Sequence, residues 1–147
     1  DETLNSEMEL HRSFCADFGI SREELEATRP SQTILAYTRF LLQTAREGSI
    51  EEIASAMLPC QWGYDQIGEE LGRTGTAAAG SLHRRWIDCY NDPAYRALTT
   101  WMRDFTDVLA EVASDERRAE MRRLFAEGVQ HEYAFWQSAW DMQEPVD

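Results

Sequence analysis

A cysteine and a tyrosine stand four residues apart in the stretch LPCQWGYDQIG, residues 58–68. In a helix, residues at this spacing lie on one face, so we expect the Cys60 thiol and the Tyr64 hydroxyl to point inward together. A thiolate is a nucleophile, and an aromatic pocket beside it would suit a small flat ring. The alternative is structural, because a single helical cysteine is more often a small buried hydrophobic residue.

Pro59 immediately precedes this cysteine. Proline has no N–H for the carbonyl of Ser55 and its ring crowds that turn, so we expect the helix to kink there. Leu58 is a poor N-cap, which favours one continuous, kinked helix over two separate ones. Apolar residues at intervals of three and four predict the buried face of this helix, formed by Ile53, Met57, Cys60, Tyr64, Ile67 and Leu71.

A second reactive group lies in the last apolar stripe of the chain. The residues that recur there with helical periodicity are Met121, Leu124, Phe125, Gly128, Glu132, Phe135, Trp136 and Ala139. A carboxylate such as Glu132 is costly to bury among aromatic residues without a partner, and such groups often serve as catalytic acid/bases. A structural ion pair with an arginine, or a solvated charge at the helix end, is the alternative. Tyr37 and Tyr90 add two inward hydroxyls, although either alone is more often a core residue.

The elements that must position these groups are helices, because alternating strand patterns are nearly absent and helix caps recur. The sequence therefore predicts an all-α fold and one domain over residues 1–147. Residues 72–80, GRTGTAAAG, are expected to form a linker. The expected helices run from Ser6 to about Phe18, Ser21 to before Pro30, Ser31 to Gly48, Ser49 to about Leu71, Leu82 to Tyr90, Asp92 to about Ala113 and Ser114 to about Trp140.

Composition limits the classes of partner. The chain carries 27 acidic and 14 basic residues, a net charge of −13, without a basic stripe. Such a surface repels phosphate backbones and anionic lipids, so neither nucleic acid nor a membrane surface is an expected partner. Three scattered histidines and three cysteines without a CxxC pair match no metal site, and no cofactor is expected. The absence of a disulfide framework and of an apolar run of about 20 residues favours a soluble cytoplasmic protein.

Several stretches resemble the TenA/thiaminase II family in order and spacing. They are AYTRFLL at 36–42, LPCQWGYDQIG at 58–68, WIDCY at 86–90 and EYAFWQSAW at 132–140. The match runs from about Glu9 to Trp140. The resemblance implies a heme-oxygenase-like helical bundle that binds no heme and assembles as a homotetramer. For the family's cysteine-containing branch it also implies hydrolysis of aminomethylpyrimidine breakdown products of thiamin, a salvage reaction, and cleavage of thiamin itself.

Carried over by residue, the resemblance places the nucleophile at Cys60, the acid/base at Glu132 and the substrate-binding tyrosines at Tyr37, Tyr64 and Tyr90. The family's first helices, with an aspartate that binds the pyrimidine amino group, have no counterpart here, so that role is assigned to no residue. The expected architecture is thus the C-terminal two-thirds of the bundle. The alternative function is a non-catalytic bundle of the same fold that binds a small ligand or a regulatory partner.

Overall fold

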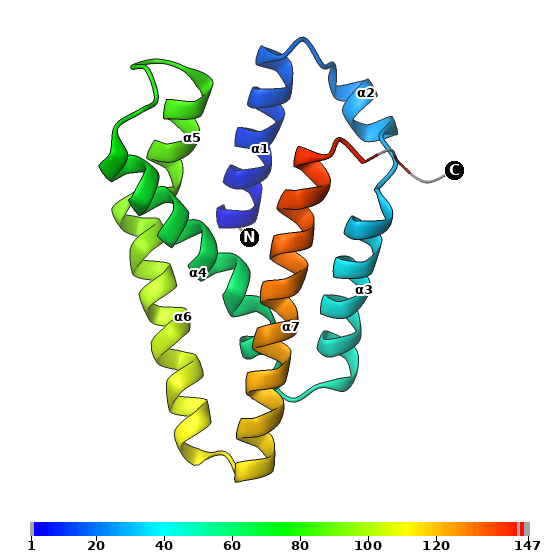
Figure 1. Cartoon of the computed structure of the whole chain (residues 1–147), viewed down its shortest axis with the longest axis vertical. Coiled ribbons are helices and arrows are strands. Elements are labelled where there is room, and N and C mark those ends of the chain that lie inside the picture. The colour runs from blue at the N-terminus through cyan, green and yellow to red at the C-terminus, as the bar shows by residue number, and fades with distance from the viewer. Residues whose placement is uncertain (1, 144, 146–147) are drawn as a thin grey trace.

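The computed structural model describes residues 2–143 and residue 145. Within them the chain forms helices and no strand, which confirms the predicted all-α class. The helices are α1 (Glu2–Asp17), α2 (Arg22–Ala27), α3 (Gln32–Glu47), α4 (Ile50–Thr74), α5 (Leu82–Tyr90), α6 (Pro93–Val112) and α7 (Asp115–Trp140). In Figure 1, α6 and α7 run in opposite directions, and α3 flanks α7 on its other side.

Side-chain caps start several of these helices at the predicted residues. At α2, Ser21 Oγ accepts the Glu24 N–H at 3.2 Å while Glu24 accepts the Ser21 N–H at 2.8 Å, which completes the predicted capping box. At α4, Glu52 accepts the Ser49 N–H at 3.1 Å. Further predicted caps whose side-chain oxygen accepts a backbone N–H are Ser31, Asp92 and Ser114. Each satisfies an N–H group that the first helical turn leaves without a partner.

Two predicted helix boundaries are wrong. The first helix already begins at Glu2, so Ser6 lies inside it and is not its N-cap. Helix α4 continues to Thr74 instead of ending before Gly72. The chain turns at Gly75, whose φ of 64° is in the left-handed region. Glycine adopts this conformation without the steric penalty of a side chain, and a glycine that remains helical, such as Gly72, gives no stop signal of its own.

Helix α4 is central, since it packs against α3, α5, α6 and α7. It passes through Pro59 without interruption, as predicted. Helix α7 approaches it closely at Gly128, where an added Cβ would lie 2.9 Å from Pro59 Cγ and 3.1 Å from the Ala56 carbonyl oxygen. A Cβ added at Gly68 would likewise lie 2.9 Å from the backbone of Tyr90 at the end of α5. The absence of a side chain at these two glycines sets the spacing of α5 and α7 from α4.

The predicted buried face of α4 is wrong in detail: Ile53, Tyr64, Ile67 and Leu71 are only partly buried, and none of the six predicted residues is fully buried. Met57 is 50% exposed and Cys60 is exposed rather than buried. The residues of α4 that are buried are Ser55, Ala56, Leu58, Pro59, Asp65 and Gly68. Most of these side chains are small because neighbouring helices come close, and hydrophobic periodicity gives small residues little weight. The Cys60 thiol therefore lies outside the packed core.

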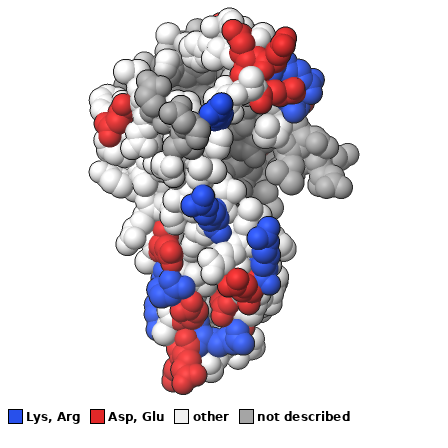
Figure 2. Space-filling view, turned by 90° about the vertical axis from the view of Figure 1, so that its right-hand side faces the viewer, with Lys and Arg blue, Asp and Glu red and all other residues white. Residues whose placement is uncertain are grey.

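Charged side chains of both signs cover the outer surface. On the side of the molecule shown in Figure 2, acidic and basic side chains intermingle at the lower end. One such group is on α7, where Arg123 contacts Glu120 at 2.7 Å and Glu127 at 2.5 Å. Exposed pairs of this kind add little stability. No helix in the described part of the chain combines the length and the hydrophobicity that a membrane span needs.

Candidate active site

Cys60 lines a cavity of about 140 Å³ together with Tyr64 and Tyr90. The other lining residues are His11, Gln61 and Tyr95. The walls thus come from α1, α4, α5 and α6. The structure brings together three of the five residues that the sequence singled out, two on α4 and one at the end of α5.

Aromatic rings form most of the surroundings of this cavity. The Tyr64 ring centroid lies 4.7 Å from that of Tyr90, 5.9 Å from Trp86 and 5.7 Å from Trp136. Tyr95 meets Tyr90 edge to face at 5.1 Å. Tyr90 is 2% exposed, held where Gly68 lets α5 approach α4. Tilted and edge-to-face pairs are favourable, so this cluster forms a stiff aromatic wall against which a flat ring can pack.

Three residues of the cavity, His11, Gln61 and Tyr95, were not predicted to belong to the site. Tyr95 lies in the first turn of α6, and its hydroxyl donates to the Gln61 carbonyl at 3.3 Å. The amide of Gln61 donates to the buried Thr99 hydroxyl at 2.9 Å, which further ties α4 to α6. Tyr95 and Thr99 share one face of α6 at a spacing of four, a signal that could have placed Tyr95 against α4.

The position of His11 depends on how α1 docks. Arg85 of α5 forms an ion pair with Asp17 and donates to the Ser13 hydroxyl at 3.2 Å. Its guanidinium also lies over the Phe14 ring, 5.0 Å from the ring centre. These contacts hold α1 beside α5 and place an imidazole on the same cavity as the Cys60 thiol. The sequence carries no local signal for this arrangement.

The two remaining predicted residues form a hydrogen-bonded pair. The Tyr37 hydroxyl of α3 donates to Glu132 Oε1 of α7 at 2.6 Å, and both side chains are partly buried. A short bond of this kind to an ionised acceptor is among the stronger hydrogen bonds in proteins. None of the described arginines forms an ion pair with Glu132, so the structural alternative considered for this carboxylate lacks its arginine.

The environment of Tyr37 keeps its hydroxyl protonated. Burial raises the pKa of Tyr37 most, and the hydrogen bond to Glu132 and its negative charge raise it further. Negative charge on Cys60 or Tyr64 would raise it too, but less. Tyr37 is therefore a neutral hydrogen-bond donor at physiological pH.

A second buried carboxylate was also missed. Asp65 is 6% exposed and is paired with Arg96 of α6 at 3.4 Å. Arg96 also contacts Glu69 at 3.6 Å, and the two carboxylates are one turn apart on α4. An ion pair that joins two packed helices in this way is a structural tie, and Asp65 is not among the residues that line the thiol cavity.

Comparison with known proteins identifies the family. The sequence model described as the TENA/THI-4/PQQC family matches residues 1–142. The chain belongs to this family. An aminopyrimidine aminohydrolase of Halalkalibacterium halodurans is 36% identical over 139 residues, which cover 95% of this chain and 62% of the relative. An aminopyrimidine aminohydrolase of Bacillus subtilis is 34% identical, over 94% of this chain and 58% of the relative.

A solved structure of the family has the same fold. The TenA homologue protein from P. horikoshii OT3 superposes with a TM-score of 0.84 and 28% identity, over 94% of this chain and 63% of that chain. The fold is therefore the heme-oxygenase-like helical bundle that the sequence resemblance implied. The chain spans less than two thirds of the length of these relatives, which have 58–63% of their residues matched.

Proposed function

We propose that this protein is an aminopyrimidine aminohydrolase, or thiaminase II, which hydrolyses thiamin-derived pyrimidines in a cytoplasmic salvage reaction. The observation that carries the proposal is the aromatic cavity that Cys60 lines, where the Tyr64 ring lies 5.7 Å from that of Trp136, one turn after Glu132 on α7. The cavity volume of about 140 Å³ is well below the roughly 300 Å³ of the smallest drug-sized pockets, which suits a single small ring. Relatives of that name are 28–36% identical to the chain.

In the proposed reaction Cys60 is the nucleophile. Its thiolate forms a C–S bond to an electron-poor carbon of the pyrimidine, and the displaced electron pair moves onto a ring nitrogen. The C–N bond to the exocyclic amine then breaks, and Glu132 passes to the leaving nitrogen the proton that it took from the Cys60 thiol. For thiamin, the thiazolium nitrogen keeps the electron pair of the C–N bond and leaves as neutral thiazole, which takes no proton.

Glu132 then acts in the opposite direction. As a carboxylate it removes a proton from water, whose oxygen bonds to the carbon that the amine left. The C–S bond breaks, the ring regains its electron pair and Cys60 leaves as a thiolate. The net change consumes one water, releases the amine and yields the hydroxymethylpyrimidine, and each step uses only side chains and solvent.

The tyrosines have separate proposed roles. Tyr64 and Tyr90 pack against the pyrimidine ring, since their rings line the thiol cavity. Tyr37 orients Glu132 by donating its hydroxyl hydrogen, so that one carboxylate oxygen remains available for proton transfer.

The proposed functional unit is larger than these 147 residues. Val129, Tyr133, Trp136 and Trp140 follow one face of α7 and are 40–85% exposed. An apolar stripe of this extent is seldom left open on a protein that works alone. We therefore propose that further helices, or a second subunit of a homotetramer, complete the bundle.

The test is hydrolysis by the protein expressed from its complete gene. With aminomethylpyrimidine as substrate, the formation of ammonia and hydroxymethylpyrimidine is measured. With thiamin as substrate, the release of thiazole is measured. The unmutated protein and the control Cys15→Ala should hydrolyse both substrates, whereas Cys60→Ala should be inactive but folded. Normal turnover by Cys60→Ala would exclude the covalent route. Pyrimidine binding without release by the unmutated protein would favour the non-catalytic alternative.

A further inference from the structure

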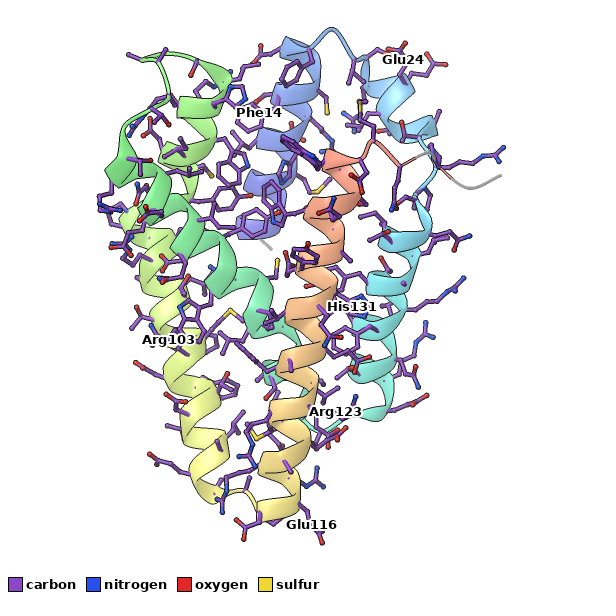
Figure 3. The ribbon with its side chains drawn as sticks, in the orientation of Figure 1. Phe14, Glu24, Arg103, Glu116, Arg123 and His131 are labelled. Carbon is purple, nitrogen blue, oxygen red and sulfur yellow. The ribbon has the colours of Figure 1, made fainter. Side chains whose placement is uncertain are left out.

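His131 immediately precedes Glu132 on α7, and Figure 3 shows its side chain between α7 and α3. Its imidazole stacks on the Tyr37 ring, with the centroids 5.1 Å apart and the planes within 4° of parallel. On α3 it also meets Phe40, at 4.9 Å and 33°. Neither the sequence pattern nor the family resemblance assigns this residue a role.

Two consecutive residues of α7 thus hold different parts of Tyr37. His131 contacts the ring face, while Glu132 accepts from the hydroxyl at 2.6 Å. The O–H of a phenol lies close to the ring plane, so the plane in which the ring is held decides which direction the donor can point. A tyrosine ring turns about its terminal torsion in a broad well, so a stacked neighbour is what fixes that plane.

His131 has an aromatic neighbour on one side and a polar groove on the other. It lines a groove of about 480 Å³ between α3 and α7, whose walls include Arg39 and Glu127. An imidazole can present its flat face to Tyr37 and its ring nitrogens to a polar groove. A purely aliphatic side chain would leave the Tyr37 ring without a parallel partner.

We propose that His131 is a positioning residue, which stacks on Tyr37 and so keeps the Tyr37 hydroxyl directed at Glu132. The proposal rests on the proposed function in one respect, namely that Glu132 is the acid/base. His131 touches neither the thiol cavity nor the reacting atoms in this account, and it acts only through Tyr37.

The kinetic test is a double-mutant cycle with a conservative rescue. His131→Leu removes the ring, and kcat for aminomethylpyrimidine should fall by about twofold to tenfold with little change in KM, the range that a lost aromatic stack supports. His131→Phe restores a flat ring and should return kcat to within about twofold of the starting value. In a Tyr37→Phe background there is no hydroxyl to direct, so His131→Leu should have no further effect on kcat. An equal loss in both backgrounds, or a loss confined to KM, would overturn the proposal.

A second cycle requires no turnover and so separates this proposal from the proposed function. The coupling free energy between Tyr37→Phe and Glu132→Ala in urea unfolding measures the hydroxyl–carboxylate bond, because alanine leaves no side-chain acceptor. The coupling free energy should be at least twofold smaller in a His131→Leu background. In a His131→Phe background it should be unchanged. An undiminished coupling in His131→Leu would refute the positioning role even if the protein hydrolyses pyrimidines. A diminished coupling in a protein without hydrolase activity would support the role and refute only the proposed function.

Discussion

Gly128→Ala is predicted to disturb the contact on which both reactive groups depend. The new Cβ would lie 2.9 Å from Pro59 Cγ and 3.1 Å from the Ala56 carbonyl oxygen. Non-bonded carbon atoms pack best at about 3.5–4.0 Å, so α7 must move away from α4 by about 0.5–1 Å. A proline ring and a backbone carbonyl cannot move aside as the end of a flexible side chain can. The clash must therefore be relieved by an increase in the distance between α7 and α4.

The magnitude follows from two opposing terms. Overpacking of a well-packed contact costs about 1–3 kcal/mol, whereas alanine is about 1 kcal/mol better than glycine inside a helix. The free energy of unfolding should therefore fall by about 0–2 kcal/mol. The effect on kcat should be larger than the effect on stability, because Glu132 lies one turn after Gly128 and Cys60 directly follows Pro59. A displacement of about 1 Å between reacting groups can lower a rate by about 100-fold.

The assay pairs urea unfolding with pyrimidine hydrolysis, and Gly63→Ala serves as the control. Gly63 lies in α4, three residues after Cys60, and a Cβ added there meets no atom within 4 Å. This variant should gain about 0.5–1 kcal/mol of stability and keep its rate. If Gly128→Ala gains as much stability as Gly63→Ala and keeps the same kcat, the reasoning from the close contact is wrong.

Four other outcomes are expected. Iodoacetamide should label Cys60 before Cys15 and Cys89, because Cys60 is exposed and the others are partly buried; equal rates would contradict this exposure. Glu132→Gln should lower kcat by about 10²–10⁴ with a smaller effect on KM, and a change in KM alone would exclude the acid/base role. The same substitution should lower the pKa of Tyr37, because the charge that opposes phenolate formation is removed; tyrosinate absorbance read against Tyr37→Phe measures it. Residues 1–147 alone should bind an apolar-surface dye and unfold with low cooperativity, and a dye-silent, cooperative monomer would contradict the proposed larger unit.

The features that sequence could predict are those set by neighbours in the chain. Cys60 and Tyr64 share a cavity because a spacing of four places them on one side of any helix. Ser31 starts a helix because a serine oxygen accepts an N–H two or three residues later whatever surrounds it. The interior position of Tyr90 follows in the same way from the periodicity of a short amphipathic helix.

The features that sequence could not predict depend on how helices meet. That Tyr37 would bond to Glu132 requires the register of α3 against α7, which no local pattern contains. His11 reaches the cavity only because Arg85 docks α1 beside α5. The buried side of α4 was misjudged because close approach selects small residues such as Ala56, which hydrophobic periodicity weights weakly.

The adjacent residues Pro59 and Cys60 show how the fold separates packing from reactivity. Successive helical residues point about 100° apart, so when Pro59 is buried against Gly128, Cys60 must turn out of that contact. A thiol inside the contact could not be reached by a substrate, and burial among apolar groups would oppose formation of the thiolate. Proline is suited to the inner position because its compact ring fills the space that the glycine at 128 leaves. The position that stabilises the α4–α7 contact thereby directs the next side chain to the cavity where the chemistry is proposed.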